Sequence, residues 1–206
     1  ALVKLAESRD DETGAHVERT SKYCRELATL ARDGSPYASQ IDAQFIQNMA
    51  LASPLHDIGK VGIPDRILLK PAKLTPEEFE TMKTHVIIGY QTLSSIEKMN
   101  PGNAFLQVGM DITRYHHEKW NGGGYQQGLS GTDIPLAARI MALSDVYDAL
   151  RSRRVYKEPF THEASMRLML EGRGTHFDPV LMDLFAAHHE AFKQIFDLAT
   201  TDAQGV

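Results

Sequence analysis

Histidine and acidic side chains recur along this 206-residue sequence at spacings that suit metal binding. The pair His56-Asp57 follows residues 42–55, whose apolar side chains recur at helical spacing. Because glycine tolerates a positive φ, we expect Gly59 to end that helix. The doublet would then lie in the last turn, where the imidazole can bind one cation and the carboxylate can bridge two. The alternative is an ordinary helix end, with a solvated aspartate and a histidine that favours the helix dipole.

Further potential ligands occur in other predicted helices. Two of them, Glu12 and His16, are four residues apart and therefore share one helical face. Asp145 lies in an otherwise apolar helix, where an uncompensated carboxylate is costly to bury, so a cation is expected beside it. A surface ion pair with Arg151 or Arg153 is the alternative. The candidate ligands are Glu12, His16, His56, Asp57, His85, His116, His117 and Asp145.

This donor set indicates a multinuclear site. Imidazole and carboxylate ligands without thiolates suit Fe, Mn, Co, Ni or Zn, and do not suit a structural cysteine-rich zinc site. Eight groups are too many for one ion and fit two ions that share a carboxylate, or three. Two cations about 3.5–4 Å apart stabilise the attacking and leaving oxygens of phosphoester hydrolysis. For the other histidines we expect structural roles: a solvent-facing His162, a surface or packing role for His188-His189, and loop orientation by His176.

Composition sets wider limits. The apolar fraction of 42% is ordinary for a globular domain. The net charge of −5 argues weakly against binding a nucleic-acid polymer, and no apolar run approaches the roughly 18 residues of a membrane span. The single cysteine, Cys24, excludes a disulfide within the chain and favours a reducing, cytoplasmic setting. The first residue is Ala1, which favours a fragment of a longer signalling protein.

The periodicity predicts an all-α fold of eight or nine helices, in one domain over residues 1–206. No stretch alternates long enough for a convincing strand. Thr75-Pro76 with Glu78 is a capping-box start, and Thr161 and Asp178 are further helix starts. The predicted helices cover residues 1–33, 42–55, 65–70, 75–82, 86–95, 104–118, 136–150, 161–172 and 178–198.

Taken together and in this order, the motifs resemble those of an HD-GYP domain, a subgroup of the HD metal-dependent phosphohydrolases. The resemblance covers nearly the whole chain. It implies an α-helical fold and hydrolysis of cyclic di-GMP to pGpG or GMP by a metal-bridging hydroxide. Its motifs are Glu12–His16, His56–Lys60, His116–Glu118 with the glycine loop after it, Leu143–Leu150 and Gly174–Pro179.

The resemblance also implies residue roles. All candidate ligands named above match its metal ligands, with Glu12 at the position associated with a third metal, and iron or manganese as the favoured ions. Lys60 matches the lysine that steadies the scissile phosphate. Arg154 and Lys157 match the basic pair that holds the substrate's phosphates, and Tyr125 is expected to contact a guanine base.

The sequence departs from the family's Gly-Tyr-Pro motif at one position. Gln126 stands where proline is usual, and Asn121 replaces a common aspartate. Without proline we expect a looser loop over residues 121–128, which weakens the expected contact of this loop with GGDEF-type partners. Two alternatives stay open: a cyclic di-GMP-binding or partner-recruiting module with little catalysis, and a hydrolase of another nucleotide. A homodimer is also left open.

Overall fold

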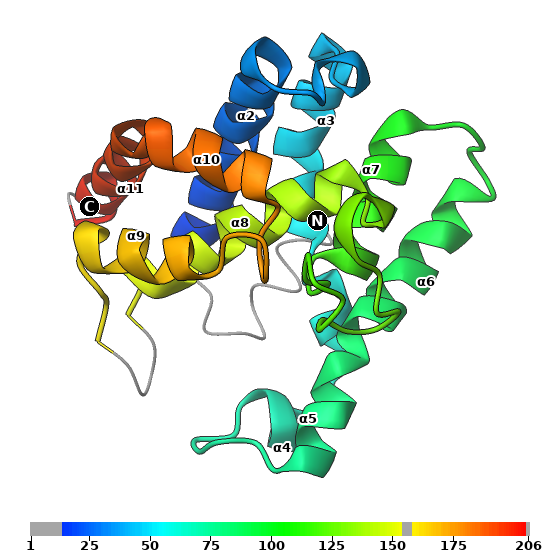
Figure 1. Ribbon diagram of the computed structural model, residues 1–206. Coiled ribbons are helices and arrows are strands. Elements are labelled where there is room, and N and C mark those ends of the chain that lie inside the picture. Colours follow the sequence, from blue (N-terminus) through cyan, green and yellow to red (C-terminus); the bar gives the residue numbers. More distant parts are fainter. Residues whose placement is uncertain (1–13, 154–157, 205–206) are drawn as a thin grey trace.

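The computed structural model describes residues 14–153 and 158–204, and within this part the all-α prediction is confirmed (Figure 1). The only β feature there is an isolated bridge between Arg173 and Phe177. Four 3-10 helices connect the α-helices, at Ala38–Gln40, Ser53–Leu55, Ile58–Gly62 and Gly131–Asp133. The α-helices are α2 (Gly14–Gly34), α3 (Ala43–Ala52), α4 (Asp65–Leu68), α5 (Pro76–Lys83), α6 (His85–Glu97), α7 (Ala104–Tyr115), α8 (Leu136–Arg151), α9 (His162–Glu171), α10 (Pro179–Ala187) and α11 (His189–Gln204).

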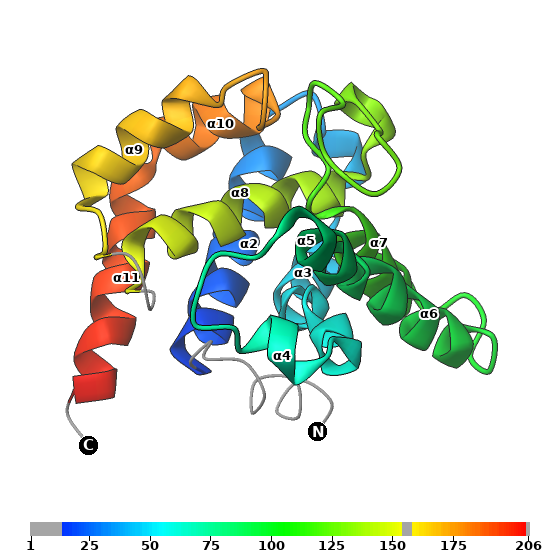
Figure 2. The ribbon, with the colours of Figure 1, turned by 90° about the horizontal axis from the view of Figure 1, so that it is seen from below.

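Helix α8 runs through the middle of the molecule. Every residue from Leu136 to Ser144 is buried, because α2, α7, α9 and α10 all pack against this helix (Figure 2). The aromatic centre of the core consists of four side chains with no exposed surface, Tyr23, Tyr147, Phe185 and Phe192. A helix that is apolar on all sides must be enclosed in this way. Position 145 therefore lies on a helix at the centre of the fold.

Helices α3, α6 and α7 form a second group beside α2, and α4 and α5 extend from it at the lower end of Figure 1. The predicted start of α5 is confirmed: Thr75 Oγ1 accepts from the Glu78 amide at 3.3 Å, and Glu78 Oε2 accepts from the Thr75 amide at 2.8 Å. Thr161 and Asp178 cap α9 and α10 as expected. These starts are predictable because the bonds that define them are local.

The last predicted helix is wrong in one respect, because it breaks into α10 and α11 at His188. Phe185 and Phe192 explain the break. In one straight helix, residues seven apart are separated by about 10.5 Å along the axis. Here their ring centroids are 4.1 Å apart, and both rings are fully buried. The turn at His188 therefore brings both rings into the same core.

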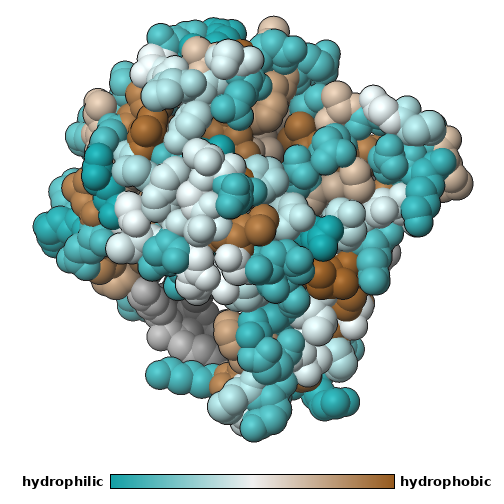
Figure 3. All heavy atoms as spheres, turned by 45° about the vertical axis from the view of Figure 1, so that its right-hand side comes forward, coloured by the Kyte–Doolittle hydropathy of each residue, from teal (hydrophilic) through white to brown (hydrophobic). Residues whose placement is uncertain are grey.

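The surface is mixed in character. On the face shown in Figure 3, hydrophobic residues form small separate patches among polar ones. Among the described residues, no helix combines the length and apolarity that crossing a bilayer requires. The organisation of residues 1–206 as one catalytic domain stays a prediction.

Candidate metal centre

The His56-Asp57 doublet lies between two short 3-10 helices that follow α3. The prediction that Gly59 ends a helix through a positive φ is wrong, since Gly59 lies inside the 3-10 helix Ile58–Gly62 and its φ is not positive. The reason for glycine here is close approach. A Cβ at this position would overlap the carbonyl oxygen of His85 and lie 2.6 Å from the amide nitrogen of Gly89. Gly59 thus lets the doublet pack directly against the start of α6.

The structure brings seven of the candidate ligands together in two adjoining groups. Within each group, the ligand atoms all lie within 4.8 Å of one another. The segments that supply them are far apart in sequence: α2, the link between the two 3-10 helices after α3, the start of α6, the residues directly after α7 and the middle of α8. The first group is Asp57, His85, His116 and His117, and the second is His16, His56 and Asp145.

Asp57 stands between the two groups and turns one carboxylate oxygen toward each. Its Oδ1 lies 3.1 Å from His85 Nε2 and 3.7 Å from His116 Nε2. Its Oδ2 lies 3.2 Å from His56 Nε2 and 2.7 Å from Lys60 Nζ. A carboxylate oriented in this way can be shared by two cations, one in each group.

Hydrogen bonds fix which nitrogen of each ring is available. The Nδ1 atoms of His56, His85 and His116 lie 2.8, 2.8 and 3.0 Å from the carbonyl oxygens of Ser53, Met82 and Ile112. A carbonyl can only accept, so each Nδ1 carries the proton and each Nε2 of a neutral ring presents a lone pair to the centre. This outward bond is the usual support of a metal-binding histidine.

The buried acceptors of this centre fit a divalent cation. Within the described part of the chain, His85 Nε2, His116 Nε2 and Asp57 Oδ1 are buried without a hydrogen-bond partner. Buried polar atoms in this state are costly, and lone pairs that face one another also repel. A cation between them would remove both costs. The donor set of nitrogen and oxygen therefore fits the kind of metal that the sequence predicts.

Charge states at the site support the same interpretation. Burial lowers the pKa of His116, and burial together with the neighbouring His116 holds the pKa of His117 well below its usual range. Burial would raise the pKa of Asp57, but Lys60 and His56 outweigh it and hold that pKa well below its usual range. Neutral imidazoles and an ionised carboxylate are the forms that bind metals.

Sequence reasoning missed the support of His16. The Nδ1 atom of His16 lies 2.8 Å from Asp148 Oδ2, and Arg19 grips the same carboxylate through two bonds of 2.6 and 2.8 Å. Burial would raise the pKa of Asp148, but Arg19 and His16 outweigh it and lower the pKa. The signal was present, since Asp148 lies three residues after Asp145 in the same apolar helix, and it is the more buried of the two.

Asp145 lies 3.8 Å from His16 Nε2, through its Oδ1 atom. The arginines of the alternative pairing have other partners: Arg151 pairs with Asp197, and Arg153 pairs with Glu158. The location of Asp145 thus supports the ligand interpretation rather than the surface ion pair.

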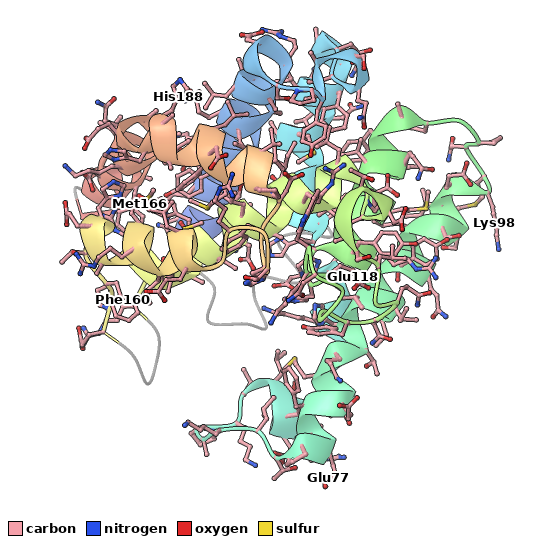
Figure 4. The ribbon with its side chains drawn as sticks, viewed as in Figure 1. Glu77, Lys98, Glu118, Phe160, Met166 and His188 are labelled. Carbon is pink, nitrogen blue, oxygen red and sulfur yellow. The ribbon has the colours of Figure 1, made fainter. Side chains whose placement is uncertain are left out.

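The glycine loop after α7 is tied to the centre at several points. Glu118, labelled in Figure 4, accepts from the amides of Gln127 and Gly128 at 2.6 and 3.2 Å. Gln126 Nε2 donates to the carbonyl oxygen of Lys83 at 2.9 Å. The ring of Tyr125 stacks on His117, with centroids 4.7 Å apart. Side-chain and backbone bonds thus hold the loop although the proline is missing.

Three predicted residues lie outside the described part of the chain: Glu12, Arg154 and Lys157.

A third group of potential ligands lies elsewhere and corrects a prediction. His162 is not solvent-facing, because only 4% of it is exposed. Its Nδ1 lies 2.9 Å from the Tyr147 hydroxyl, and its Nε2 lies 2.9 Å from His189 Nδ1. Glu190 lies nearby. Because both ring nitrogens of His162 have partners, this group is satisfied without a cation. His176 does take part in the loop that leads to α10, since its carbonyl oxygen accepts from the Trp120 amide at 3.0 Å.

Comparison with known proteins places the chain in a family. The model of the HD domain family matches residues 1–181. The chain belongs to the HD domain family. For an HD domain, divalent metals are the implied cofactors, and the two groups around Asp57 are the candidates for holding them. The family resemblance predicted from the motifs is confirmed.

Individual relatives agree with this assignment. This HD domain is 50% identical over 95% of its length to a "Probable cyclic di-GMP phosphodiesterase" of Vibrio cholerae. It is 42% identical over 93% of its length to the "3'3'-cGAMP-specific phosphodiesterase 2" of the same organism. The chain spans only 44% and 34% of those two proteins. A solved structure described as an HDG"Y"P protein from Bdellovibrio bacteriovorus matches 84% of this chain and 52% of that one, with a TM-score of 0.59 and 20% identity, and supports the fold.

Proposed function

We propose that this HD domain is a metal-dependent phosphodiesterase that hydrolyses cyclic di-GMP to pGpG, GMP or both. The observation that carries the proposal is the carboxylate of Asp57, which turns one oxygen toward each group of histidines. The relative that is half identical over almost the whole chain, and is named for this activity, supports the choice of substrate.

The metal ligands of the proposed centre are Asp57, His85, His116 and His117 for one ion and His16, His56, Asp145 and the shared Asp57 for the other. Iron or manganese is favoured, with nickel, cobalt and zinc as further options, and Glu12 is the proposed ligand of a third ion. When bound, two such cations would activate water and neutralise charge on a phosphodiester.

Lys60 is the proposed cation for the scissile phosphate. Its ammonium lies 2.7 Å from Asp57 Oδ2, and only 16% of its side chain is exposed. It can therefore donate a hydrogen bond to a phosphate oxygen held beside Asp57, in a site where water screens the charge only weakly. Arg154 and Lys157 are proposed to hold the second phosphate, because an arginine can grip it with two donors and a lysine adds compact charge.

The test is hydrolysis of cyclic di-GMP under anaerobic conditions after loading with Fe(II) or Mn(II), with metal counted on the same sample. We expect GMP or pGpG from the wild type, and loss of both metal and product in Asp57→Ala. Asp33→Ala is the matched control, because Asp33 is exposed and pairs only with the neighbouring Arg32 in the described contacts. Normal turnover by Asp57→Ala with a full metal complement would overturn the proposal.

A second candidate function is motivated by Gln126 and by the relative named for 3'3'-cGAMP. The domain would then bind a cyclic dinucleotide with little turnover, or would prefer the mixed dinucleotide. Bound metal and bound nucleotide without product would favour the binding module, and faster hydrolysis of 3'3'-cGAMP would favour the other substrate. A contact of the 121–128 loop with GGDEF-type proteins, a homodimer and a cytoplasmic location stay predictions.

A further inference from the structure

Beside the candidate metal centre, two aromatic rings and a lysine from different elements meet. Phe79 and Lys83 are four residues apart on α5 and therefore share a face of that helix. The ring of Phe79 meets the ring of Tyr125 edge to face, with centroids 6.1 Å apart. Lys83 Nζ lies 5.5 Å from the centroid of Phe79 and 5.6 Å from that of Tyr125. Both separations are within the range of a cation–π contact.

This group extends directly from the metal ligands. Tyr125 stacks on His117, one of the candidate ligands, and Phe79 in turn contacts Tyr125 edge to face. Phe79 is 46% exposed, so one part of its ring is open to a ligand. The Glu77 label in Figure 4 marks the outer end of the same helix, away from the centre. The two rings and a candidate metal ligand therefore form one continuous row of contacts, His117–Tyr125–Phe79.

A hydrogen bond joins the 121–128 loop to α5 and so holds the rings of Tyr125 and Phe79 next to each other. Gln126 Nε2 donates to the carbonyl oxygen of Lys83 at 2.9 Å, so the residue after Tyr125 is attached to the residue that covers both rings. The ammonium of Lys83 also pairs with Glu80 at 2.5 Å, but the Glu80 side chain is 69% exposed. A surface ion pair of this kind is weak and can exchange one partner for another.

We propose that Phe79, Lys83 and Tyr125 form a nucleobase subsite that selects guanine. The proposal rests on the proposed function and adds the recognition of the base. The aromatic rings supply stacking surface, which accepts any base. Lys83 supplies the selection, because guanine presents two acceptors, O6 and N7, on one edge, whereas adenine presents a donor in place of O6.

The first experiment separates base binding from chemistry. We expect Phe79→Ala to raise KM for cyclic di-GMP on the order of tenfold, with kcat within twofold of the wild type and metal content unchanged. Phe79→Trp should restore KM, because it restores an aromatic face. Leu168→Ala is the matched control, since Leu168 is a comparably exposed apolar side chain on α9, and its KM should equal that of the wild type.

The second experiment tests selection. Lys83→Met keeps the length of the side chain and the backbone bond to Gln126 but removes the charge. The ratio of kcat/KM for cyclic di-GMP over cyclic di-AMP should fall about tenfold, by loss of one charge-assisted hydrogen bond. Should the wild type bind without turnover, the same comparisons are made on Kd.

Each outcome has a defined meaning. An unchanged KM in Phe79→Ala would overturn the subsite. A lower kcat together with loss of metal would also overturn it, because the change would then act through Tyr125 on the metal ligand His117. An unchanged ratio in Lys83→Met would overturn guanine selection. A wild type that cleaves only other phosphodiesters and fails to bind cyclic di-GMP would overturn the proposed function, and the subsite with it.

Discussion

Asp148→Ala is the change that most directly tests how the centre is supported. Asp148 is fully buried and accepts two bonds from Arg19, whose side chain is only 7% exposed, and it also contacts His16 Nδ1 at 2.8 Å. Alanine at this position leaves a buried guanidinium without its counter-ion. It also leaves His16 without the group that fixes its tautomer.

The expected magnitudes follow from these two losses. Breaking a buried ion pair on one side costs about 3–5 kcal/mol in the free energy of unfolding, because the remaining charge stays buried. Removing the outer partner of a metal-binding histidine lowers metal affinity about 10–100-fold. The first loss concerns the whole fold, and the second concerns only the metal near His16.

Asp178→Ala is the control that separates the two effects. Asp178 is also fully buried, pairs with Arg139 at 2.6 Å and accepts from the Tyr37 hydroxyl at 2.8 Å, but none of these residues is a candidate ligand. It also caps α10, which adds about 1 kcal/mol to its loss. We expect Asp178→Ala to be at least as destabilising and to retain wild-type metal affinity.

Urea unfolding of metal-free protein measures the first effect, and competition with a chromophoric chelator measures the second. Asp148→Asn keeps the volume and one acceptor oxygen, so it provides a folded sample should the alanine variant unfold. Unchanged metal affinity in both Asp148 variants would refute the assigned support of His16. An equal loss of affinity in Asp178→Ala would show that general destabilisation is the cause.

Two further predictions concern a close contact and a titration. Gly59→Ala should lower the free energy of unfolding by about 1–3 kcal/mol or more and reduce metal content, because its Cβ would push against the backbone of His85. Gly34→Ala is the control, because a Cβ there meets only an ordinary contact, and it should change neither quantity. A stable Gly59→Ala variant with its full metal content would contradict the close approach of the two backbones. Burial raises the pKa of Asp111 from 3.8 to about 6, against the opposing hydrogen bond from Gln107. The folded state thus holds the proton more tightly, so stability should decrease as pH rises from about 4 to about 6. Asp111→Asn should remove this dependence of stability on pH and raise the free energy of unfolding at pH 7 by about 1–3 kcal/mol. Urea titrations at several pH values would measure both effects. If the variant keeps the same dependence on pH, another group causes it.

Local features of the fold were predictable from the sequence. Thr75 caps α5 with Glu78 as expected, because cap and partner are three residues apart. The ligand groups were predictable from residue type, since histidines at helix ends together with a carboxylate in an apolar helix are typical of metal ligands. The position of Asp148 in an apolar helix was a signal of a special role, but its pairing with Arg19 was not predictable, because Arg19 is 129 residues away in sequence.

Features that depend on tertiary packing were predicted wrongly or for the wrong reason. His162 was expected to face solvent, but the turn at His188 brings His189 against it. Gly59 was expected to supply a positive φ, and its actual role is to admit the backbone of α6. In both cases the deciding neighbour comes from another helix, which the local sequence pattern does not contain.

The carbonyl bonds to His56, His85 and His116 have a thermodynamic consequence. Each ring is oriented by a carbonyl only three or four residues before it in the sequence. The rotational entropy of these side chains is therefore lost when the helix ends form, and not when a metal arrives. A metal that bound these rings would not have to order them, so less of its binding free energy would be spent on side-chain entropy. This arrangement differs from that of small zinc domains, whose ligands are ordered only by the ion.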